Sequence, residues 1–232
     1  SELLDIENKT VINDQLNPTK EGLTMGEVMA GINRYTNGEA IIVSDVGQHQ
    51  MFAWRYSKFV KSRSNVTSGG LGTMGFALPA AIGAKLGAEN REVIAIIGDG
   101  GYQMTCNELG TILQTKAAVK IVVLNNGYLG MVRQWQTLFY NQRYSNTDLH
   151  SKRIPDFKML AEAMGCVGLR CETPGDVDKT IEAAMAINDR PVVVDFNVHR
   201  DAMVWPMVAA GTSNDDITVA RSMAPVWDSK EL

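Results

Sequence analysis

Two polar motifs, each directly behind an apolar run, constrain the fold and the chemistry of this chain most strongly. One apolar run, 93–97, leads into Gly98-Asp99-Gly100, and another, 119–124, leads into Asn125-Asn126. Continuous apolar runs of this length are typical of strands buried on both faces of a parallel sheet. Ligands bind such sheets at the carboxyl ends of the strands, so Asp99 and Asn126 are candidate ligand-binding residues.

The residue types at these two strand ends suit a metal-bound phosphate ester. A carboxylate and an amide carbonyl are hard oxygen ligands of the kind that Mg²⁺ or Ca²⁺ prefers. The glycines beside Asp99 would let a polyanion approach the backbone N–H groups. A purely structural alternative also exists for each half alone, namely an Asp that caps a helix and an Asn pair that forms a turn.

Strand-like and helix-like segments alternate about six times along the chain. This alternation predicts an α/β fold, a doubly wound, mainly parallel six-stranded sheet with helices on both faces. Capping-box spacing at Thr24 and Glu27 predicts a helix over 25–35, and the same spacing at Thr105 and Glu108 predicts a helix that begins near Cys106. Further helices are expected over 76–86, 128–140, 156–164 and 174–187, with strands over 40–44, 167–171 and 191–198.

Two further segments fit a site at the sheet edge. Gln48 and His49 follow the 40–44 strand where a helix begins, so they could donate to an anion beside a helix N-terminus or act as a surface cap. The glycine-rich segment 69–75 holds one bulky residue, Met74, which indicates backbone pressed close to a ligand. No Gly-Lys-Ser/Thr follows, so this loop is not a P-loop, and a methionine there is more often a core residue.

Composition excludes several classes of function. The 232 residues suffice for one large domain, and the net charge of -4, without a basic stripe, speaks against nucleic-acid binding. No apolar segment is long enough to span a bilayer, and residues 1–5 lack the features of a signal peptide. Three cysteines without metal-binding spacing are expected to be reduced thiols. The predicted organisation is a linker arm over 1–21, one domain over 22–199, and a tail over 200–232 that covers the active site.

The motifs together resemble a known enzyme family. A Gly-Asp-Gly followed some two dozen residues later by Asn-Asn resembles the thiamine diphosphate motif. The segments 47–50, 69–75 and 130–136 are similar to those of the large catalytic subunit of acetohydroxyacid synthase, also called acetolactate synthase. The similarity runs from about residue 23 to 211 and corresponds to the C-terminal, diphosphate-binding third of that enzyme. The family's pyrimidine-binding domain and its FAD-binding middle domain lie outside this similarity.

The resemblance implies a role for each site residue. Mg²⁺ would be held by Asp99, Asn126 and the backbone carbonyl of Tyr128. The remaining cofactor contacts would come from Gln48, His49, Gly100 and Gly101 at the diphosphate, and from Gly72, Met74 and Met131 around the two rings. Met74 would force the bent form of the cofactor, which makes its activation intramolecular. Met131 and Trp135 would line the substrate pocket.

The resemblance also implies an activity and partners. The family decarboxylates pyruvate and joins the two-carbon unit to a second 2-oxo acid, in branched-chain amino acid biosynthesis. Its activating glutamate belongs to the pyrimidine-binding domain of the same or a partner subunit, so this chain alone is expected to be inactive. Expected partners are copies of the chain in a homo-oligomer such as a dimer, a regulatory small subunit and small 2-oxo acids, with neither nucleic acid nor a membrane. The expected location is the cytoplasm, or the organelle stroma in a plant or fungus.

Three alternatives remain open from the sequence. The chain could serve another thiamine diphosphate-dependent 2-oxo acid decarboxylase or a carboligase such as glyoxylate carboligase. It could be a separate subunit of a split enzyme, which the coding sequence immediately upstream would settle. It could also be a non-catalytic domain whose thiamine site is residual and whose role is subunit contact.

Overall fold

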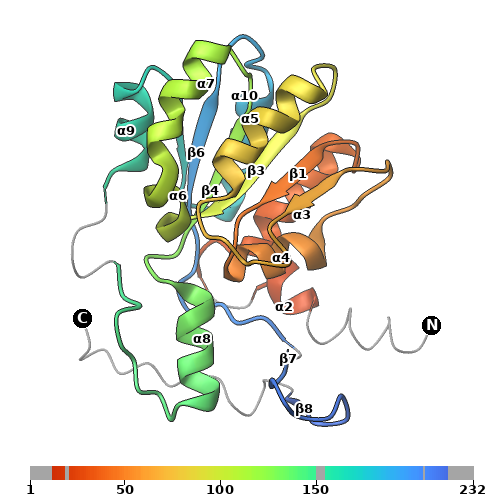
Figure 1. The fold of residues 1–232 in the computed structure, drawn as a ribbon, viewed down its shortest axis with the longest axis vertical. Coiled ribbons are helices and arrows are strands. Elements are labelled where there is room, and N and C mark those ends of the chain that lie inside the picture. The colour runs from red at the N-terminus through yellow and green to blue at the C-terminus, as the bar shows by residue number, and fades with distance from the viewer. Residues whose placement is uncertain (1–11, 19–20, 150–154, 206, 219–232) are drawn as a thin grey trace.

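The computed structural model describes residues 12–18, 21–149, 155–205 and 207–218, and their centre is one parallel sheet (Figure 1). All six strands run parallel, in the order β2-β1-β3-β4-β6-β5. The strands are β1 (Ile41–Ser44), β2 (Asn65–Thr67), β3 (Val93–Gly98), β4 (Lys120–Asn125), β5 (Val167–Cys171) and β6 (Val192–Asn197). The predicted six-stranded α/β sheet is therefore confirmed, and every described strand pair within it is parallel.

The central strand β3 shows how the apolar runs build two cores. All of its residues are buried. Because successive side chains of a strand point to opposite faces, Ile94 and Ile96 enter one core, whereas Val93, Ala95 and Ile97 enter the other. A strand whose side chains are buried on both faces must be apolar at every position. The run therefore lacks the alternation of apolar and polar residues that a half-exposed strand shows.

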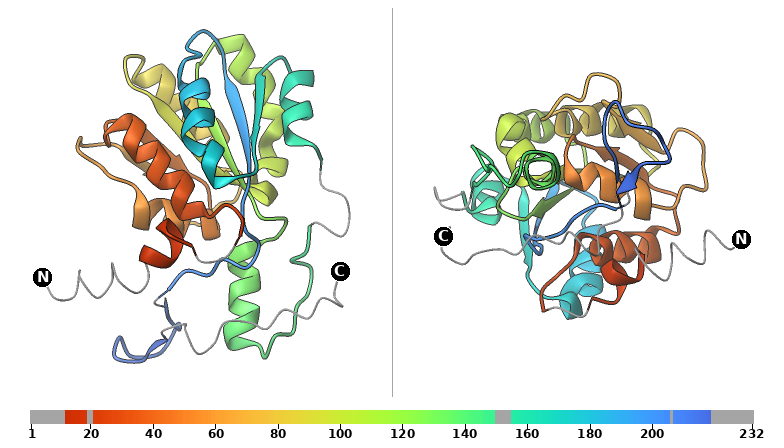
Figure 2. Two further views of the ribbon diagram at one scale, coloured as in Figure 1. Left: turned by 180° about the vertical axis from the view of Figure 1, so that it is seen from behind. Right: turned by 90° about the horizontal axis from the view of Figure 1, so that it is seen from below.

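Helices cover both faces of the sheet, as predicted (Figure 2). The first core lies under α3 (Met25–Thr36), α4 (Gln48–Tyr56) and α10 (Val177–Met185). The second lies under α5 (Ala77–Gly87), α6 (Asp99–Thr105), α7 (Leu109–Thr115) and α9 (Phe157–Ala163). The 3₁₀ turns η2 (Cys106–Glu108) and η4 (Pro174–Asp176) lead into α7 and α10, so the helix expected over 174–187 is shorter and starts with a 3₁₀ turn.

The start of α3 confirms the first predicted capping box. The Thr24 hydroxyl accepts from the Glu27 N–H at 3.1 Å, and the Glu27 carboxylate accepts from the Thr24 N–H at 2.8 Å. Asn37, in the left-handed region with φ of 52°, ends the helix. The helix thus spans nearly the predicted residues because its local signals agree with the packing of its buried face.

The second predicted capping box, at Thr105 and Glu108, is wrong. Helical structure does begin at Cys106, as predicted, where η2 leads into α7, but the Thr105 side chain makes no cap there. Thr105 is instead the last residue of the preceding helix α6, which begins at Asp99 immediately after β3. The Thr105 hydroxyl donates to the Gly75 carbonyl at 3.0 Å, while Glu108 accepts from Thr111 at 2.7 Å. A tertiary hydrogen bond to the glycine-rich loop therefore replaces the local cap that the spacing suggested.

The remaining elements lie near the carboxyl edge of the sheet. Helix α8 (Gly130–Phe139) stands beyond this edge (Figure 1). The short helix α2 (Asn13–Leu16) packs against α3. Although residues after 200 showed no periodicity, β7 (Met207–Val208) and β8 (Ile217–Thr218) pair as a small antiparallel ribbon. Among the described residues, no helix is both long enough and apolar enough to cross a bilayer.

The strand order creates a switch point between β1 and β3. The chain leaves β1 through α4 toward β2, and it leaves β3 through α6 toward β4 on the opposite side. Helix α4 belongs to the first core and α6 to the second, so the two connections diverge onto opposite faces. A crevice opens at such a point, at the carboxyl ends of the strands, and this is where doubly wound sheets bind ligands.

Candidate cofactor-binding site

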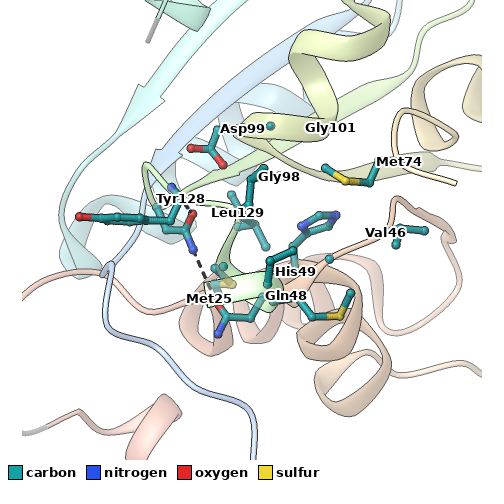
Figure 3. Close-up of a pocket in the computed structure, with 17 residues that line it drawn as sticks. Met25, Val46, Gln48, His49, Met74, Gly98, Asp99, Gly101, Tyr128 and Leu129 are labelled. Atoms are coloured by element: carbon teal, nitrogen blue, oxygen red, sulfur yellow. Dashed lines mark hydrogen bonds between the residues drawn. The ribbon is translucent and has the colours of Figure 1, made fainter. Parts of the chain in front are cut away.

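A pocket lies at this switch point, among the segments that follow β1, β3 and β4 (Figure 3). It encompasses about 430 Å³ of space not filled by protein atoms, part of which is open to solvent. Every residue predicted to bind cofactor or metal lines it, with the exception of Gly72: Gln48, His49, Met74, Asp99, Gly100, Gly101, Asn126, Tyr128 and Met131. The predicted residues that meet in this pocket are up to 83 positions apart in the sequence, from Gln48 to Met131.

Asp99 carries a buried carboxylate with one oxygen free. Its residue is 1% exposed, and Oδ2 has no hydrogen-bond partner in the described part of the chain. Burial raises the pKa of Asp99 to about 7, although the backbone N–H groups of Gly100 and Gly127 oppose the rise. A buried acceptor without a donor is costly, so this oxygen is suited to a cation that replaces the proton.

His49 places a buried, neutral imidazole in the same pocket (Figure 3). Burial lowers the pKa of His49 to about 3, so its imidazole carries no charge at neutral pH. Its Nε2 atom is buried and has no partner among the described residues. Ideal Cβ atoms on Gly47 and Gly98 would lie 2.7 and 2.6 Å from the ring, so both glycines are needed to seat it.

The side-chain amide of Asn126 is oriented by partners on both of its ends. Its Oδ1 accepts from the Tyr128 N–H at 3.1 Å, and its Nδ2 donates to Gln48 Oε1 at 3.4 Å, the contact dashed in Figure 3. Oδ1 has a second lone pair that remains for a ligand. The Arg133 guanidinium stacks 3.7 Å above the Tyr128 ring, which holds this turn beside the pocket.

Gln48 uses its own donors within the protein. Its Nε2 donates to Gln134 Oε1 at 3.0 Å and to the Ala202 carbonyl at 2.5 Å. An amide nitrogen has two protons, and these two bonds employ both. The predicted donation from Gln48 to the diphosphate therefore stays a prediction that requires this side chain to turn.

The glycine-rich loop contributes Met74 to the pocket but not Gly72. Gly72 is exposed with φ of 64°, and an added Cβ would meet nothing within 4 Å. The loop is held by Asp45, a fully buried residue whose carboxylate accepts from the N–H groups of Gly75 at 3.0 Å and Ala77 at 3.3 Å. This clamp and the Thr105 hydrogen bond fix Gly75, the residue that follows Met74, and Met74 itself lines the pocket.

Trp135 lies outside this pocket. It lines a second, largely apolar hollow along α8 together with Met131, Val132, Gln136, Tyr140 and Arg143. Its ring meets the Phe139 ring edge-on, with centroids 5.1 Å apart. Met131 lines both hollows, so the predicted substrate residues form a continuous wall that leads away from the cofactor pocket.

Three supporting residues were not predicted from the sequence. Asp45 and Gln134 are buried polar residues that act through contacts distant in sequence. Asp195, on β6, accepts from Asn125 Nδ2 at 3.0 Å and pairs with Arg170 at 3.3 Å, so it fixes the end of β4 beside Asn126. Only Asp45 carried a usable signal, since it directly follows a strand near other site residues.

The residues fit a magnesium-bound diphosphate better than a metal alone. Across the described ranges, no three His, Cys, Asp or Glu side chains cluster as a metal site. A cation at Asp99 would thus take further ligands from Asn126, backbone carbonyls, water or an anion that it carries. Asp99 Oδ2 offers an oxygen ligand to the cation, and the N–H of the neutral His49 imidazole could donate to the anion.

Comparison with known proteins gives the family. A model of the thiamine pyrophosphate enzyme C-terminal TPP-binding domain matches residues 45–196. The acetolactate synthase of Mycobacterium leprae (strain TN) is 55% identical over 216 residues, which cover 92% of this chain and 35% of that protein. The acetolactate synthase large subunit of Corynebacterium glutamicum is 51% identical over 206 residues, which are 88% of this chain and 33% of that protein.

Similarity extends to more distant bacteria. The acetolactate synthase isozyme 3 large subunit of Escherichia coli (strain K12) is 44% identical over 191 residues, which cover 82% of this chain and 33% of that protein. The chain therefore spans about a third of the length of the curated relatives it matches. The matched family model begins at Asp45 and ends in β6, and so contains every pocket segment except Met25. The chain belongs to the family of C-terminal thiamine pyrophosphate-binding domains of thiamine pyrophosphate enzymes.

Proposed function

We propose that this chain is the diphosphate- and Mg²⁺-binding part of an acetolactate synthase. That enzyme decarboxylates pyruvate and condenses the two-carbon unit with a second 2-oxo acid. One pocket holds two buried atoms, Asp99 Oδ2 and His49 Nε2, that have no hydrogen-bond partner among the described residues. This observation, in a chain that is 55% identical to an acetolactate synthase, carries the proposal.

The metal half of the pocket would be formed by Asp99, Asn126 and the Tyr128 carbonyl. Asp99 must be ionised to bind Mg²⁺, and with a pKa of about 7 it exchanges a proton for the cation at neutral pH. The amide contacts of Asn126 leave its oxygen available to the same cation. Since the third ligand is a backbone atom, the Tyr128 side chain contributes by packing rather than by coordination.

The diphosphate half would be formed by His49 and the backbone N–H groups of Gly100 and Gly101. A neutral His49 donates from Nε2 without adding charge, because burial keeps the pKa of this imidazole low. Bound thiamine diphosphate supplies a nucleophilic carbon and an electron sink for decarboxylation. Met74 would hold the bent form of the cofactor, and the Asp45 clamp keeps the Met74 loop in place.

The substrate side of the reaction belongs to α8. Met131 lies between the cofactor pocket and the apolar hollow that Trp135 lines. A second 2-oxo acid would bind along this wall, where Trp135 distinguishes its side chain by contact area. The glutamate that activates the cofactor would come from a pyrimidine-binding domain of the same or a partner subunit, in a homo-oligomer that also binds FAD and a regulatory subunit. The enzyme would act in the cytoplasm or an organelle stroma.

The test uses the complete polypeptide encoded by the reading frame that contains these residues. Purified protein with thiamine diphosphate, Mg²⁺ and FAD is incubated with pyruvate alone and with pyruvate plus 2-oxobutyrate. The proposal predicts 2-acetolactate from the first mixture and 2-aceto-2-hydroxybutyrate as an added product from the second. Release of acetaldehyde without a condensation product would instead assign a 2-oxo acid decarboxylase, and absence of any turnover with cofactor bound would assign a non-catalytic domain.

A further inference from the structure

A bidentate contact docks the segment 202–205 beside the pocket. Gln134, on α8, is 2% exposed and pairs with both backbone groups of Val204. Its Oε1 accepts from the Val204 N–H at 3.0 Å, and its Nε2 donates to the Val204 carbonyl at 2.9 Å. The side chain thus binds one residue of this segment as a neighbouring strand would, and Val204 itself is buried.

Gln48 extends this contact to the candidate metal ligand. Its Nε2 donates to Gln134 Oε1 at 3.0 Å and to the Ala202 carbonyl at 2.5 Å, while its Oε1 accepts from Asn126 Nδ2 at 3.4 Å. Three side-chain amides, on α8, on α4 and directly after β4, therefore connect the backbone of 202–204 to the candidate metal site. This series of amides, Gln134, Gln48 and Asn126, is called the amide relay.

Backbone groups fix which end of each amide in the relay, nitrogen or oxygen, faces its neighbour, because a backbone carbonyl can only accept a hydrogen bond and a backbone N–H can only donate one. The Ala202 carbonyl only accepts, so the nitrogen end of Gln48 must face it. The oxygen end of Gln48 then faces Asn126 and attracts its nitrogen end. Asn126 is left with its oxygen toward the Tyr128 N–H and the pocket, which is the orientation that a cation requires.

We propose that Gln48 and Gln134 are positioning residues that couple the docking of 202–205 to the orientation of Asn126, and thereby to Mg²⁺ affinity. This inference rests on the proposed function, since it takes the cation site at Asp99 and Asn126 as given. It adds a positioning task to the donation to the diphosphate predicted for Gln48, since in this structure both of its amide protons serve Gln134 and Ala202. Partners that orient a metal ligand typically contribute a factor of ten or more to metal affinity.

The test is a double-substitution cycle in the complete polypeptide. Gln48→Leu, Gln134→Leu and the double variant remove the amides at similar side-chain volume, and Gln114→Leu, at an exposed position of α7, is the control. Calorimetry measures Mg²⁺ affinity at saturating thiamine diphosphate. Hydrogen exchange, read by mass spectrometry, measures protection of the 200–208 peptide in the absence of ligand.

The amide relay predicts a specific pattern of non-additivity. Each single substitution should weaken Mg²⁺ binding about tenfold, and the double variant should bind no more weakly than the weaker single variant. Gln134→Leu should also speed exchange in 200–208, whereas the control should change neither quantity. Unchanged Mg²⁺ affinity in Gln134→Leu, or additive losses in the double variant, would overturn the coupling.

The same experiment separates failure of this inference from failure of the proposed function. If the unsubstituted polypeptide binds no Mg²⁺ with thiamine diphosphate, the cation site itself is refuted and the coupling to it falls as well. If the unsubstituted polypeptide binds Mg²⁺ and Gln134→Leu binds it equally, the site stands and only the role of the relay is refuted. Thermal unfolding of each variant identifies any that fails to fold. If Gln134→Leu fails to fold, Gln134→Met takes its place in the cycle, because it keeps the length of the side chain without its amide, and the same losses are expected.

Discussion

Replacement of Asp99 by asparagine should stabilise the ligand-free protein while it abolishes Mg²⁺ binding. The folded structure raises the pKa of Asp99 from 3.8 to about 7, mainly by burial. An acid whose pKa is higher in the folded state binds more protons there than in the unfolded state, so its ionisation opposes folding as pH rises. The contribution is most favourable below the unfolded value and is lost as pH rises toward about 7.

The size of the effect follows from this shift. Each pKa unit corresponds to 1.36 kcal/mol, so ionised Asp99 lowers the free energy of unfolding by up to about 4 kcal/mol near pH 8. Near pH 5 only about 2 kcal/mol is lost, because the folded carboxyl still holds its proton there. The asparagine side chain of the variant has no charge to bury, so Asp99→Asn should exceed the unsubstituted protein in stability by a margin that grows across this range.

Urea denaturation at several pH values between about 5 and 8 measures the margin, with Asp215→Asn at an exposed position as the control. Saturating Mg²⁺ and thiamine diphosphate should narrow the margin, since a ligand at one hundred times its Kd adds about 2.7 kcal/mol to the protein that binds it. A variant that is no more stable than the unsubstituted protein near pH 8, or a margin that does not depend on pH, would refute the reasoning about burial.

Three further changes test other parts of the site. Gly98→Ala places a Cβ 2.6 Å from the His49 ring and should weaken thiamine diphosphate binding at least tenfold by calorimetry, whereas Gly87→Ala, which meets nothing within 4 Å, should leave it unchanged. Equal affinities of the two variants would contradict the role of the imidazole. Asp45→Ala leaves two backbone N–H groups without acceptors and should lower the free energy of unfolding by about 1–3 kcal/mol, measured in urea; full stability would show that the clamp is dispensable. Trp135→Leu should shift the product ratio in a mixture of pyruvate and 2-oxobutyrate without changing Mg²⁺ affinity, and an unchanged ratio would exclude Trp135 from substrate selection.

The parts of the fold that follow from local sequence were predicted correctly. The strands β3 and β4 are buried on both faces, and burial on both faces demands an apolar run that is visible without any structure. Parallel strands bring their carboxyl ends to one edge, so Asp99 and Asn126 could be placed together from that rule. The α3 capping box was visible because its partners are three residues apart.

The parts that depend on distant partners could not be predicted. Gln48 and Gln134 are 86 positions apart, and neither residue type signals a buried amide pair. Thr105 carried a valid capping signal, yet its hydroxyl binds the Gly75 carbonyl 30 positions away. In both cases a tertiary hydrogen bond decides the outcome, and a local pattern contains no information about it. The orientation of the glycine-rich loop was likewise not predictable, because nothing in its composition shows that Met74 faces the pocket while Gly72 is exposed.

The central claim is that the crevice between β1, β3 and β4 holds thiamine diphosphate through Mg²⁺ at Asp99. The most direct test is a calorimetric titration of thiamine diphosphate into the complete polypeptide, with and without Mg²⁺, for the unsubstituted protein and for Asp99→Asn. The claim predicts binding that requires Mg²⁺, releases a proton near pH 6 and is lost in Asp99→Asn. Binding that is equally tight in Asp99→Asn, or that does not need Mg²⁺, would contradict it.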